Sequence, residues 1–301
     1  MSPLYPKPST LNPDTVSLAA QIACLLEVSA AKPGNVTRFA DFADARYADY
    51  LASAAILGMV FRKAATVMAG TLILNVVRET QRLVRRNTNL GIALLFAPLA
   101  KAALLGGGRS LRLRLHGVLA SLTPTDGQKV YEAIRLAQPG GLGEAEHFDV
   151  RTTRGRVPLL AAMRKAMERD SIAREYTSDF ELTFTIGVPA LKECVKESGD
   201  PEASIVQTYL TLLSRVPDSL IARKCGMERA RTVSRQARRI LAIGGAFTRE
   251  GRQHLKRWDR ALRTGGNRLN PGTTADLTAA AIYAVMLGEG IDFMLGRGGG
   301  H

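Results

Sequence analysis

Apolar residues recur every three or four positions over most of this chain, and that spacing constrains the fold more than any other feature of the sequence. The pattern is typical of helices that bury one face. Proline follows a capping residue at Asn12-Pro13, Thr123-Pro124 and Asn270-Pro271, an order that favours a helix start. Helices are therefore predicted over residues 12–28, 50–62, 64–84, 89–105, 124–137, 158–176, 203–215, 229–241 and 271–287.

One segment departs from this spacing, because Phe180, Leu182, Phe184 and Ile186 alternate with polar side chains as in a strand. A lone strand would have no partner, and Phe180 and Phe184 also fit helical spacing, so the segment is predicted to be helical. The chain has no internal repeat of ~30–45 residues and no low-complexity linker. The sequence thus predicts a single all-α domain at residues 12–301, with about ten to fourteen packed helices, behind a flexible arm at residues 1–11.

The charge of the chain points to an anionic partner. Its 301 residues are 46% hydrophobic and 23% charged, which excludes a disordered or fibrous chain. Lysine and arginine outnumber the acids 41 to 27, and a net charge of +14 favours nucleotides, nucleic acid or an anionic membrane. The longest uncharged apolar stretches, 64–77 and 90–100, are shorter than the ~20 residues that span a bilayer, and the N-terminal prolines do not fit a signal peptide. We expect a cytoplasmic protein with no membrane span, whose three separated cysteines hold no zinc.

The segment Asn270-Pro271-Gly272-Thr273-Thr274-Ala275-Asp276 is the first of three candidate anion sites at predicted helix starts. The backbone N–H groups of Gly272, Thr273 and Thr274 would be free at the helix N-terminus, where they can bind phosphate. Asp276 would repel phosphate unless a divalent cation lay between them, and Mg²⁺ commonly takes one or two carboxylates together with phosphate oxygens. Ordinary helix capping explains the same residues and stays open.

Two further segments have the same character. Asn87-Thr88-Asn89-Leu90-Gly91 opens an apolar helix directly after Arg85-Arg86, which suits phosphate, although a simple cap after a basic helix end explains it as well. Lys32-Pro33-Gly34-Asn35-Val36 is a similar turn. It leads into Arg38, Asp41, Asp44 and Asp49, whose acids fit either a metal site or a solvated loop.

Acid–base chemistry is suggested by a fourth segment, which follows the glycine turn at residues 140–143. It places Glu146, His147 and Asp149 within four positions. A surface position is the alternative for each of them. The chain lacks the H-E-x-x-H, G-x-S-x-G and G-x-x-x-x-G-K-[ST] patterns, so zinc proteases, hydrolases of the nucleophile-elbow type and Walker-type nucleotide sites are not supported.

Taken together, these segments resemble the triphosphoribosyl-dephospho-CoA synthase family over nearly the whole chain. The resemblance rests on Lys32-Pro33-Gly34-x-Val36, on Asn87-Thr88-Asn89-x-Gly91 followed by Ala97-Pro98-Leu99, and on Pro271-Gly272-x-x-Ala275-Asp276-Leu277, in the family's order. It implies an all-α enzyme that transfers the triphosphoribosyl group of ATP to a hydroxyl of dephospho-CoA and releases adenine. ATP and a small hydroxyl acceptor are then the partners, and a homo-oligomer is left open.

The resemblance also implies roles for the candidate residues. Displacement at the anomeric carbon passes through an oxocarbenium-like state, which nearby carboxylates favour. We expect Asp276, Asp49 and Asp44 to hold Mg²⁺ on the triphosphate, and Asp149, Glu146 or His147 to move protons. Phosphate binding is expected from Lys32, Gly34, Asn35, Arg38, Asn87, Thr88, Asn89, Gly91, Gly272, Thr273 and Thr274.

The acceptor stays open, because the chain departs from the citrate-lyase branch of the family. That branch carries a lysine where this chain has Leu90, and a His-x-Asp-Met element of which only Asp49 is retained. Residues 137–143 look closer to a branch in archaea and methanopterin-using bacteria, which makes a tetrahydromethanopterin-pathway intermediate the second candidate acceptor. The alternatives are a nucleotide-binding homologue without transfer activity and a basic nucleic-acid-binding protein. The second is disfavoured because few aromatic residues accompany the arginines.

Overall fold

The computed structural model describes residues 11–296, and this part of the chain folds into fifteen α-helices without a strand. The all-α prediction is confirmed, with one helix more than the upper end of the expected range. The helices are α1 (Pro13–Ser29), α2 (Tyr47–Phe61), α3 (Ala69–Leu83), α4 (Leu90–Leu104), α5 (Leu111–Ala120), α6 (Pro124–Ala137), α7 (Leu159–Ala166), α8 (Ser171–Thr177), α9 (Val188–Ser198), α10 (Pro201–Arg215), α11 (Ser219–Cys225), α12 (Met227–Ala242), α13 (Arg249–Arg263), α14 (Gly272–Glu289) and α15 (Ile291–Met294), with a π-helix η2 (Thr183–Gly187) and a 3₁₀-helix η3 (Gly245–Phe247).

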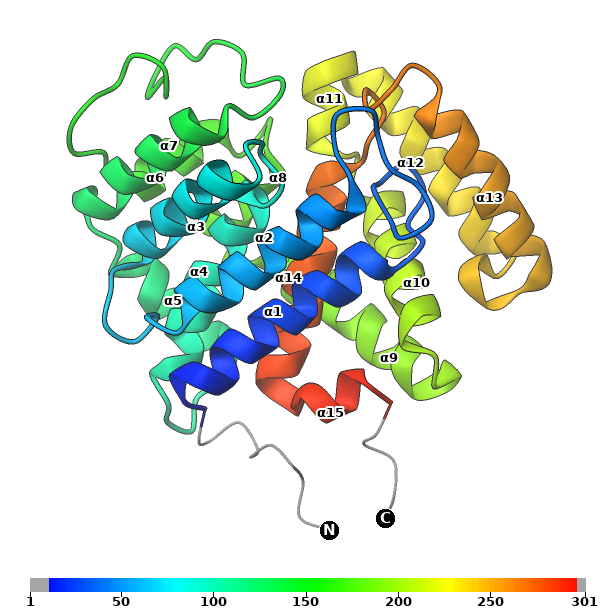
Figure 1. The fold of residues 1–301 in the computed structure, drawn as a ribbon, viewed down its shortest axis with the longest axis horizontal. Helices are drawn as coiled ribbons and strands as arrows, with labels where there is room; N and C mark the ends of the chain where they lie inside the picture. Colours follow the sequence, from blue (N-terminus) through cyan, green and yellow to red (C-terminus); the bar gives the residue numbers. More distant parts are fainter. Residues whose placement is uncertain (1–10, 297–301) are drawn as a thin grey trace.

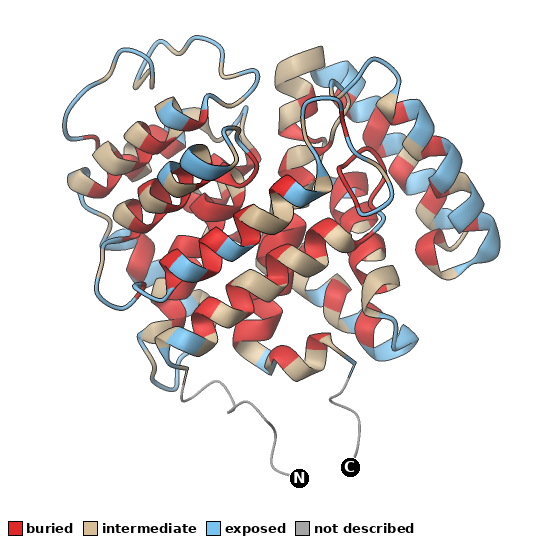
Figure 2. Ribbon diagram, viewed as in Figure 1, coloured by how far each residue is buried: buried red, intermediate tan, exposed pale blue. Residues whose placement is uncertain are grey.

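Helix α14 forms the centre of the fold. Thirteen of its eighteen residues are buried, as expected for a helix that is apolar on every side. It packs against α1, α4, α9, α10 and α11, and in Figure 1 it passes between α3–α8 on one side and α9–α13 on the other. The Phe96 ring of α4 stacks on Tyr283 of α14 with centroids 4.3 Å apart. Figure 2 shows the burial concentrated along this axis, whereas the outer face of α13 is exposed.

Two of the three proline-marked helix starts are confirmed as capped starts, whereas α14 begins at Gly272 with Pro271 as its N-cap and without a side-chain cap from Asn270. The Asn12 side chain accepts a hydrogen bond from the Thr15 N–H at the start of α1, and Thr123 forms a capping box with Asp126 at the start of α6. Asp126 also accepts from the Gly70 N–H at 2.8 Å, so this cap fastens α6 to α3. Local sequence signals therefore fixed both the start of α6 and part of its packing.

Other helix limits differ from the prediction. The segment 158–176 is two helices rather than one, because the Asp170 carboxylate accepts from the Ile172 and Ala173 N–H groups and starts α8 anew. The helix expected over 64–84 begins only at Ala69. Helices α5, α9, α11, α13 and α15 were not predicted, and α9 and α15 have no side-chain cap. The caps of α5, α11 and α13, which are Ser110, Asp218 and Thr248, have no proline after them, and a lone cap residue is too common in loops to mark a helix.

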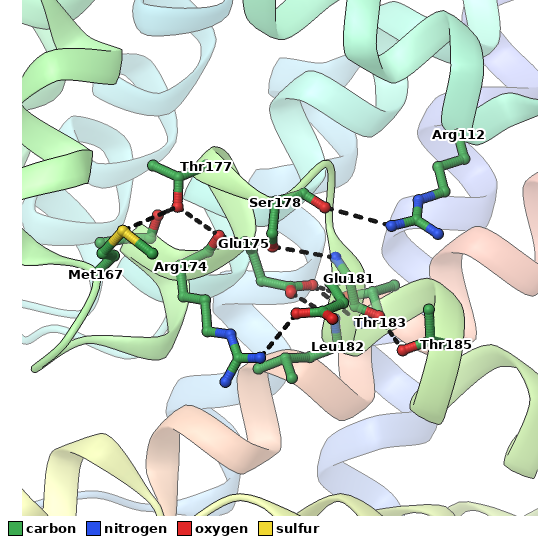
Figure 3. A network of polar contacts seen from close by, with 11 residues as sticks. Arg112, Met167, Arg174, Glu175, Thr177, Ser178, Glu181, Leu182, Thr183 and Thr185 are labelled. Carbon is green, nitrogen blue, oxygen red and sulfur yellow. Dashed lines mark hydrogen bonds and ion pairs between the residues drawn. The ribbon is translucent and has the colours of Figure 1, made fainter.

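Residues 181–187 are helical, as predicted, and they follow a sharp turn (Figure 3). Asp179 and Phe180 have φ values of 52° and 55°, which places both in the left-handed region. The buried Glu175 carboxylate accepts from the Leu182 and Thr183 N–H groups at 2.8 and 3.0 Å and from the Thr183 hydroxyl at 2.5 Å. This carboxylate satisfies the free N–H groups where the chain re-enters a helix.

Residues 1–10 and 297–301 lie outside the described part of the chain, so the arm at 1–11 and the outer limits of the domain stay predictions. None of the helices within residues 11–296 combines the length and the apolar composition needed to cross a bilayer.

Candidate active site

A cavity of about 600 Å³ lies where the three sequence segments meet, a volume within the range of small-molecule sites. Its wall combines the end of α1, the loop before α2, the N-termini of α4 and α14, the end of α11, and the connection between α6 and α7. Ten of the predicted site residues line it: Asn35, Asp44, Asn87, Thr88, Asn89, Gly91, His147, Gly272, Thr273 and Asp276. The fold thus brings together segments that are more than 200 positions apart in the sequence.

The loop that contains the first segment is fixed from two other helices. Tyr209 of α10 donates its hydroxyl to the Pro33 carbonyl at 2.8 Å and accepts from the Asn35 side-chain amide at 3.0 Å. Gly34 has a φ of 77°, and its N–H donates to Asp259 of α13 at 2.8 Å. Asn35 therefore faces the cavity, while Gly34 lies behind it.

Lys32 does not line the cavity, although the sequence suggested a phosphate contact. Its ammonium group is buried 3.0 Å from the Glu27 carboxylate, and it also donates to the backbone carbonyls of Glu27 and Ala30. Glu27 lines the cavity in its place. The sequence reading missed Glu27 because a single acid near the end of an apolar helix carries no signal of its own.

The second segment presents the start of α4 to the cavity. Two of its side chains are fixed by hydrogen bonds to α2 and α3. Asn89 donates to the Thr80 hydroxyl at 3.0 Å, and the Thr88 and Ser53 hydroxyls are 2.5 Å apart. The Asn87 side chain accepts from the Leu90 N–H at 3.2 Å. The N–H groups of Gly91 and Ile92 have no hydrogen-bond acceptor within residues 11–296, so this helix start can still bind an anion.

In the third segment, more of the backbone N–H groups are hydrogen-bonded within the protein than the sequence predicted. Asp218 accepts from the Thr274 N–H and hydroxyl at 2.7 and 2.8 Å, and the Gly272 N–H donates to the Asn270 carbonyl at 2.9 Å. Of the three N–H groups predicted to be free, only that of Thr273 lacks an acceptor in the described part of the chain. Thr274 points away from the cavity toward Asp218.

The second and third segments meet at Asp276 and Gly91. A methyl group on Gly91 would lie 2.0 Å from one carboxylate oxygen of Asp276, so only glycine fits there. Within residues 11–296, no hydrogen bond or ion pair reaches the Asp276 carboxylate. Burial, followed by the charges of Glu27 and Asp218, raises its pKa well above the ordinary value. The charge of Arg223 only partly offsets this rise, so the charged form of Asp276 needs a cation that no side chain within residues 11–296 supplies by direct contact.

Asp44, Asp49 and Arg38 have different surroundings. Asp44 lines the cavity and accepts from the Asn267 side chain at 2.6 Å. Asp49 does not line it: its carboxylate caps α2 and lies 3.6–3.7 Å from the Arg86 and Arg46 guanidinium groups. Arg38 pairs with Glu202 at 2.6 Å on the exposed surface.

The three residues considered for proton transfer are also separated by the structure. His147 lines the cavity, whereas Asp149 and Glu146 do not. Asp149 accepts from the side chain and the N–H of Arg151 and from the Ala145 N–H, and these bonds hold its pKa well below the usual range. A carboxyl group of this kind carries no proton near neutral pH, so Asp149 is poorly suited to act as a general acid.

Five cations that the sequence reading did not single out as site residues also line the cavity: Arg86, Lys165, Arg169, Arg223 and Lys224. Arg86 belongs to the basic pair noted before the second segment, but the other four stand on helices or turns where charged residues normally face solvent. Only their position in the folded chain marks them as part of the site.

The residues present would suit a divalent cation that arrives with a phosphate ligand. No group of three or more His, Cys, Asp or Glu residues within 11–296 is arranged to hold a metal by itself. The Asp276 and Asp44 carboxylates both face the cavity, however, and one or two carboxylates plus phosphate oxygens are the ligands that Mg²⁺ prefers.

Known proteins resemble the chain over most of its length. A family profile described as ATP:dephospho-CoA triphosphoribosyl transferase matches residues 13–293. Relatives named 2-(5''-triphosphoribosyl)-3'-dephosphocoenzyme-A synthase share 28% identity over 121 residues in Klebsiella pneumoniae and 33% over 105 residues in Pectobacterium atrosepticum. These alignments cover 40% and 35% of this chain, and 39% and 33% of the two relatives. The chain thus matches between 33% and 39% of the length of these relatives.

A solved structure extends the similarity to the fold. A protein from Archaeoglobus fulgidus, described provisionally as a triphosphoribosyl-dephospho-CoA synthase, superposes with a TM-score of 0.60 at 29% sequence identity. The superposition covers 80% of this chain and 99% of the archaeal one. The resemblance drawn from the three segments is therefore confirmed, and the chain belongs to the ATP:dephospho-CoA triphosphoribosyl transferase family.

Proposed function

We propose that this protein transfers the triphosphoribosyl group of ATP to a hydroxyl group of a small acceptor and releases adenine. The observation that carries the proposal is the contact between Gly91 and the Asp276 carboxylate, which joins two family segments at one cavity. In the reaction, the bond between the ribose anomeric carbon and adenine breaks and a bond to the acceptor oxygen forms. The proton lost by the hydroxyl balances the proton gained by the departing adenine.

The N-termini of α4 and α14 are the proposed site for the triphosphate. The free N–H groups of Gly91, Ile92 and Thr273 would donate to phosphate oxygens. The Asp276 and Asp44 carboxylates would hold the Mg²⁺ bound to ATP, and that ion would offset the repulsion between carboxylates and phosphates. Buried negative charge near the ribose would in addition favour the positive charge that develops on the ring.

His147 is the proposed proton donor to adenine. Of the three candidates it alone faces the cavity, and an imidazole can donate a proton near neutral pH. The proposal includes two candidate acceptors, which are dephospho-CoA and a tetrahydromethanopterin-pathway intermediate with a free hydroxyl. The family description favours the first, and the similarity of residues 137–143 to a methanopterin-associated branch favours the second.

The test is release of adenine from ATP and Mg²⁺, measured by liquid chromatography with mass detection, with each acceptor in turn. We expect adenine only when an acceptor is present, together with an acceptor product heavier by the triphosphoribosyl group. Asp276→Asn should lower the rate by at least about 10²-fold, and the exposed Asp14→Asn is the matched control. Absence of adenine with both acceptors would refute the proposal.

A further inference from the structure

Four of the cavity cations form a wall that the proposed triphosphate site does not use. Lys165 lies in α7, Arg169 follows it in the turn before α8, and Arg223 and Lys224 end α11. The Asp170–Arg223 ion pair, 2.6 Å long, joins the two segments. The wall therefore has a defined position, although its halves are more than 50 residues apart in the sequence.

The positive charge of this wall is only partly neutralised. Asp170 pairs with Arg223, but Lys224 donates only to the backbone and side-chain oxygens of Asn267, at 3.2 and 3.4 Å. Arg169 donates to the Glu144 carbonyl at 3.0 Å. Lys165 has no hydrogen-bond or ion-pair partner within residues 11–296. Three cations therefore face the cavity without a carboxylate partner, and burial lowers the pKa of Lys224. A bound anion would stabilise the charged form of Lys224.

The connection between α6 and α7 lies close against the same wall. A methyl group on Gly140 would lie 3.0 Å from Cε of Lys224. A methyl group on Gly141, whose φ is 69°, would lie 2.9 Å from Cβ of Arg223. The two glycines thus let the backbone approach the cations closely. The space beside the wall is lined by apolar or aromatic side chains of α6 and α7, namely Tyr131, Ile134, Leu159, Ala162 and Met163.

We propose that Lys165, Arg169 and Lys224 bind a phosphate group of the acceptor, whose apolar part lies along α6 and α7. The inference rests on the proposed function, because a transferase must hold two substrates in one cavity. In the proposed function, the phosphates of ATP bind the N-termini of α4 and α14 and the Mg²⁺ held by carboxylates. The lysine and arginine side chains of the cation wall are therefore available to bind a phosphate of the acceptor. The acceptor is accordingly a phosphate monoester or diphosphate with an aromatic or apolar body, and a neutral alcohol without phosphate does not bind.

Calorimetric binding of inorganic pyrophosphate in EDTA tests the anion site without either substrate. Binding at the N-termini of α4 and α14 would not respond to the lysine variants, so the difference between wild type and variants reports on the cation wall. We expect Lys165→Gln/Lys224→Gln to weaken it at least about tenfold, the effect of losing charge-assisted hydrogen bonds. Lys256→Gln, an exposed lysine of α13, is the matched control. Arg169→Gln provides a second variant at an exposed position should the double variant fail to fold. Equal pyrophosphate affinity in wild type and variants would overturn the proposal.

A second titration assigns the anion site to the acceptor. We expect dephospho-CoA to bind the double variant at least about tenfold more weakly than wild type, and MgATP to bind both with equal affinity. Equal losses for MgATP and dephospho-CoA would show that the cations serve the donor, which would also overturn the proposal. Failure of the proposed function would look different, because no adenine would be released although pyrophosphate binding still depended on the lysines.

Discussion

Replacing Gly91 with alanine tests the contact on which the site is built. The new methyl group would lie 2.0 Å from one Asp276 oxygen, 2.9 Å from the other and 2.4 Å from the carboxyl carbon. These separations are far below van der Waals contact, so the carboxylate or the start of α4 must move. Overpacking of this kind costs about 1–3 kcal/mol, and the gain from replacing a helical glycine offsets about 0.5–1 kcal/mol. We therefore expect Gly91→Ala to lower the free energy of unfolding by about 1–2 kcal/mol.

A double-mutant cycle separates this clash from other effects. Asp276→Ala removes the group that the methyl would strike, so Gly91→Ala should cost almost nothing in the Asp276→Ala background. Urea unfolding of wild type, both single variants and the double variant should give a coupling free energy of about 1–2 kcal/mol.

The control is Gly117→Ala, because Gly117 lies in α5 with open space around the added methyl group. That change should be neutral or stabilising by up to about 1 kcal/mol. If the effects of Gly91→Ala and Asp276→Ala simply add to within about 0.5 kcal/mol, the proposed contact between α4 and α14 is wrong.

Three further perturbations follow from buried polar groups. Asp218→Ala leaves three donors unsatisfied and should lower the free energy of unfolding, measured in urea, by about 2–4 kcal/mol. Asp218→Asn should lower it less, and equal losses for the two variants would contradict the hydrogen-bonding role. Tyr209→Phe removes both contacts to the first segment, so it should lower the free energy of unfolding by about 1–2 kcal/mol and make limited proteolysis within residues 33–46 faster. An unchanged cleavage rate would contradict this role of Tyr209. Burial raises the pKa of Glu175 from 4.5 to about 7, so the folded chain binds this proton more tightly than the unfolded chain does. The stability of wild type relative to Glu175→Gln should therefore fall by about 3 kcal/mol as the pH rises from about 4.5 to about 7, measured by urea unfolding at several pH values, and a pH-independent difference would refute it.

The fold could be predicted where helix signals are local. Proline after a capping residue placed the starts of α1 and α6 within one position, since both the cap and the proline act within a single turn. The single helix expected over 158–176 was wrong because Asp170, the cap that starts α8, has no proline after it to mark the helix start. Asp170, which starts α8, is also bound by Arg223 of α11, and nothing within 158–176 shows that partner.

The helical fold and the segments that carry the family's motifs could be predicted from the sequence, because turns at helix starts and the order of motifs are properties of neighbouring residues. Which of their side chains face the cavity depended on how the helices pack. Lys32 and Arg38 were expected to share one role, yet Lys32 is buried against Glu27 and Arg38 is paired with Glu202 on the surface. Lys165 and Lys224, which the sequence did not distinguish, line the cavity instead. The reason is physical: burial and charge pairing depend on residues far apart in the chain, and only packing brings those residues together.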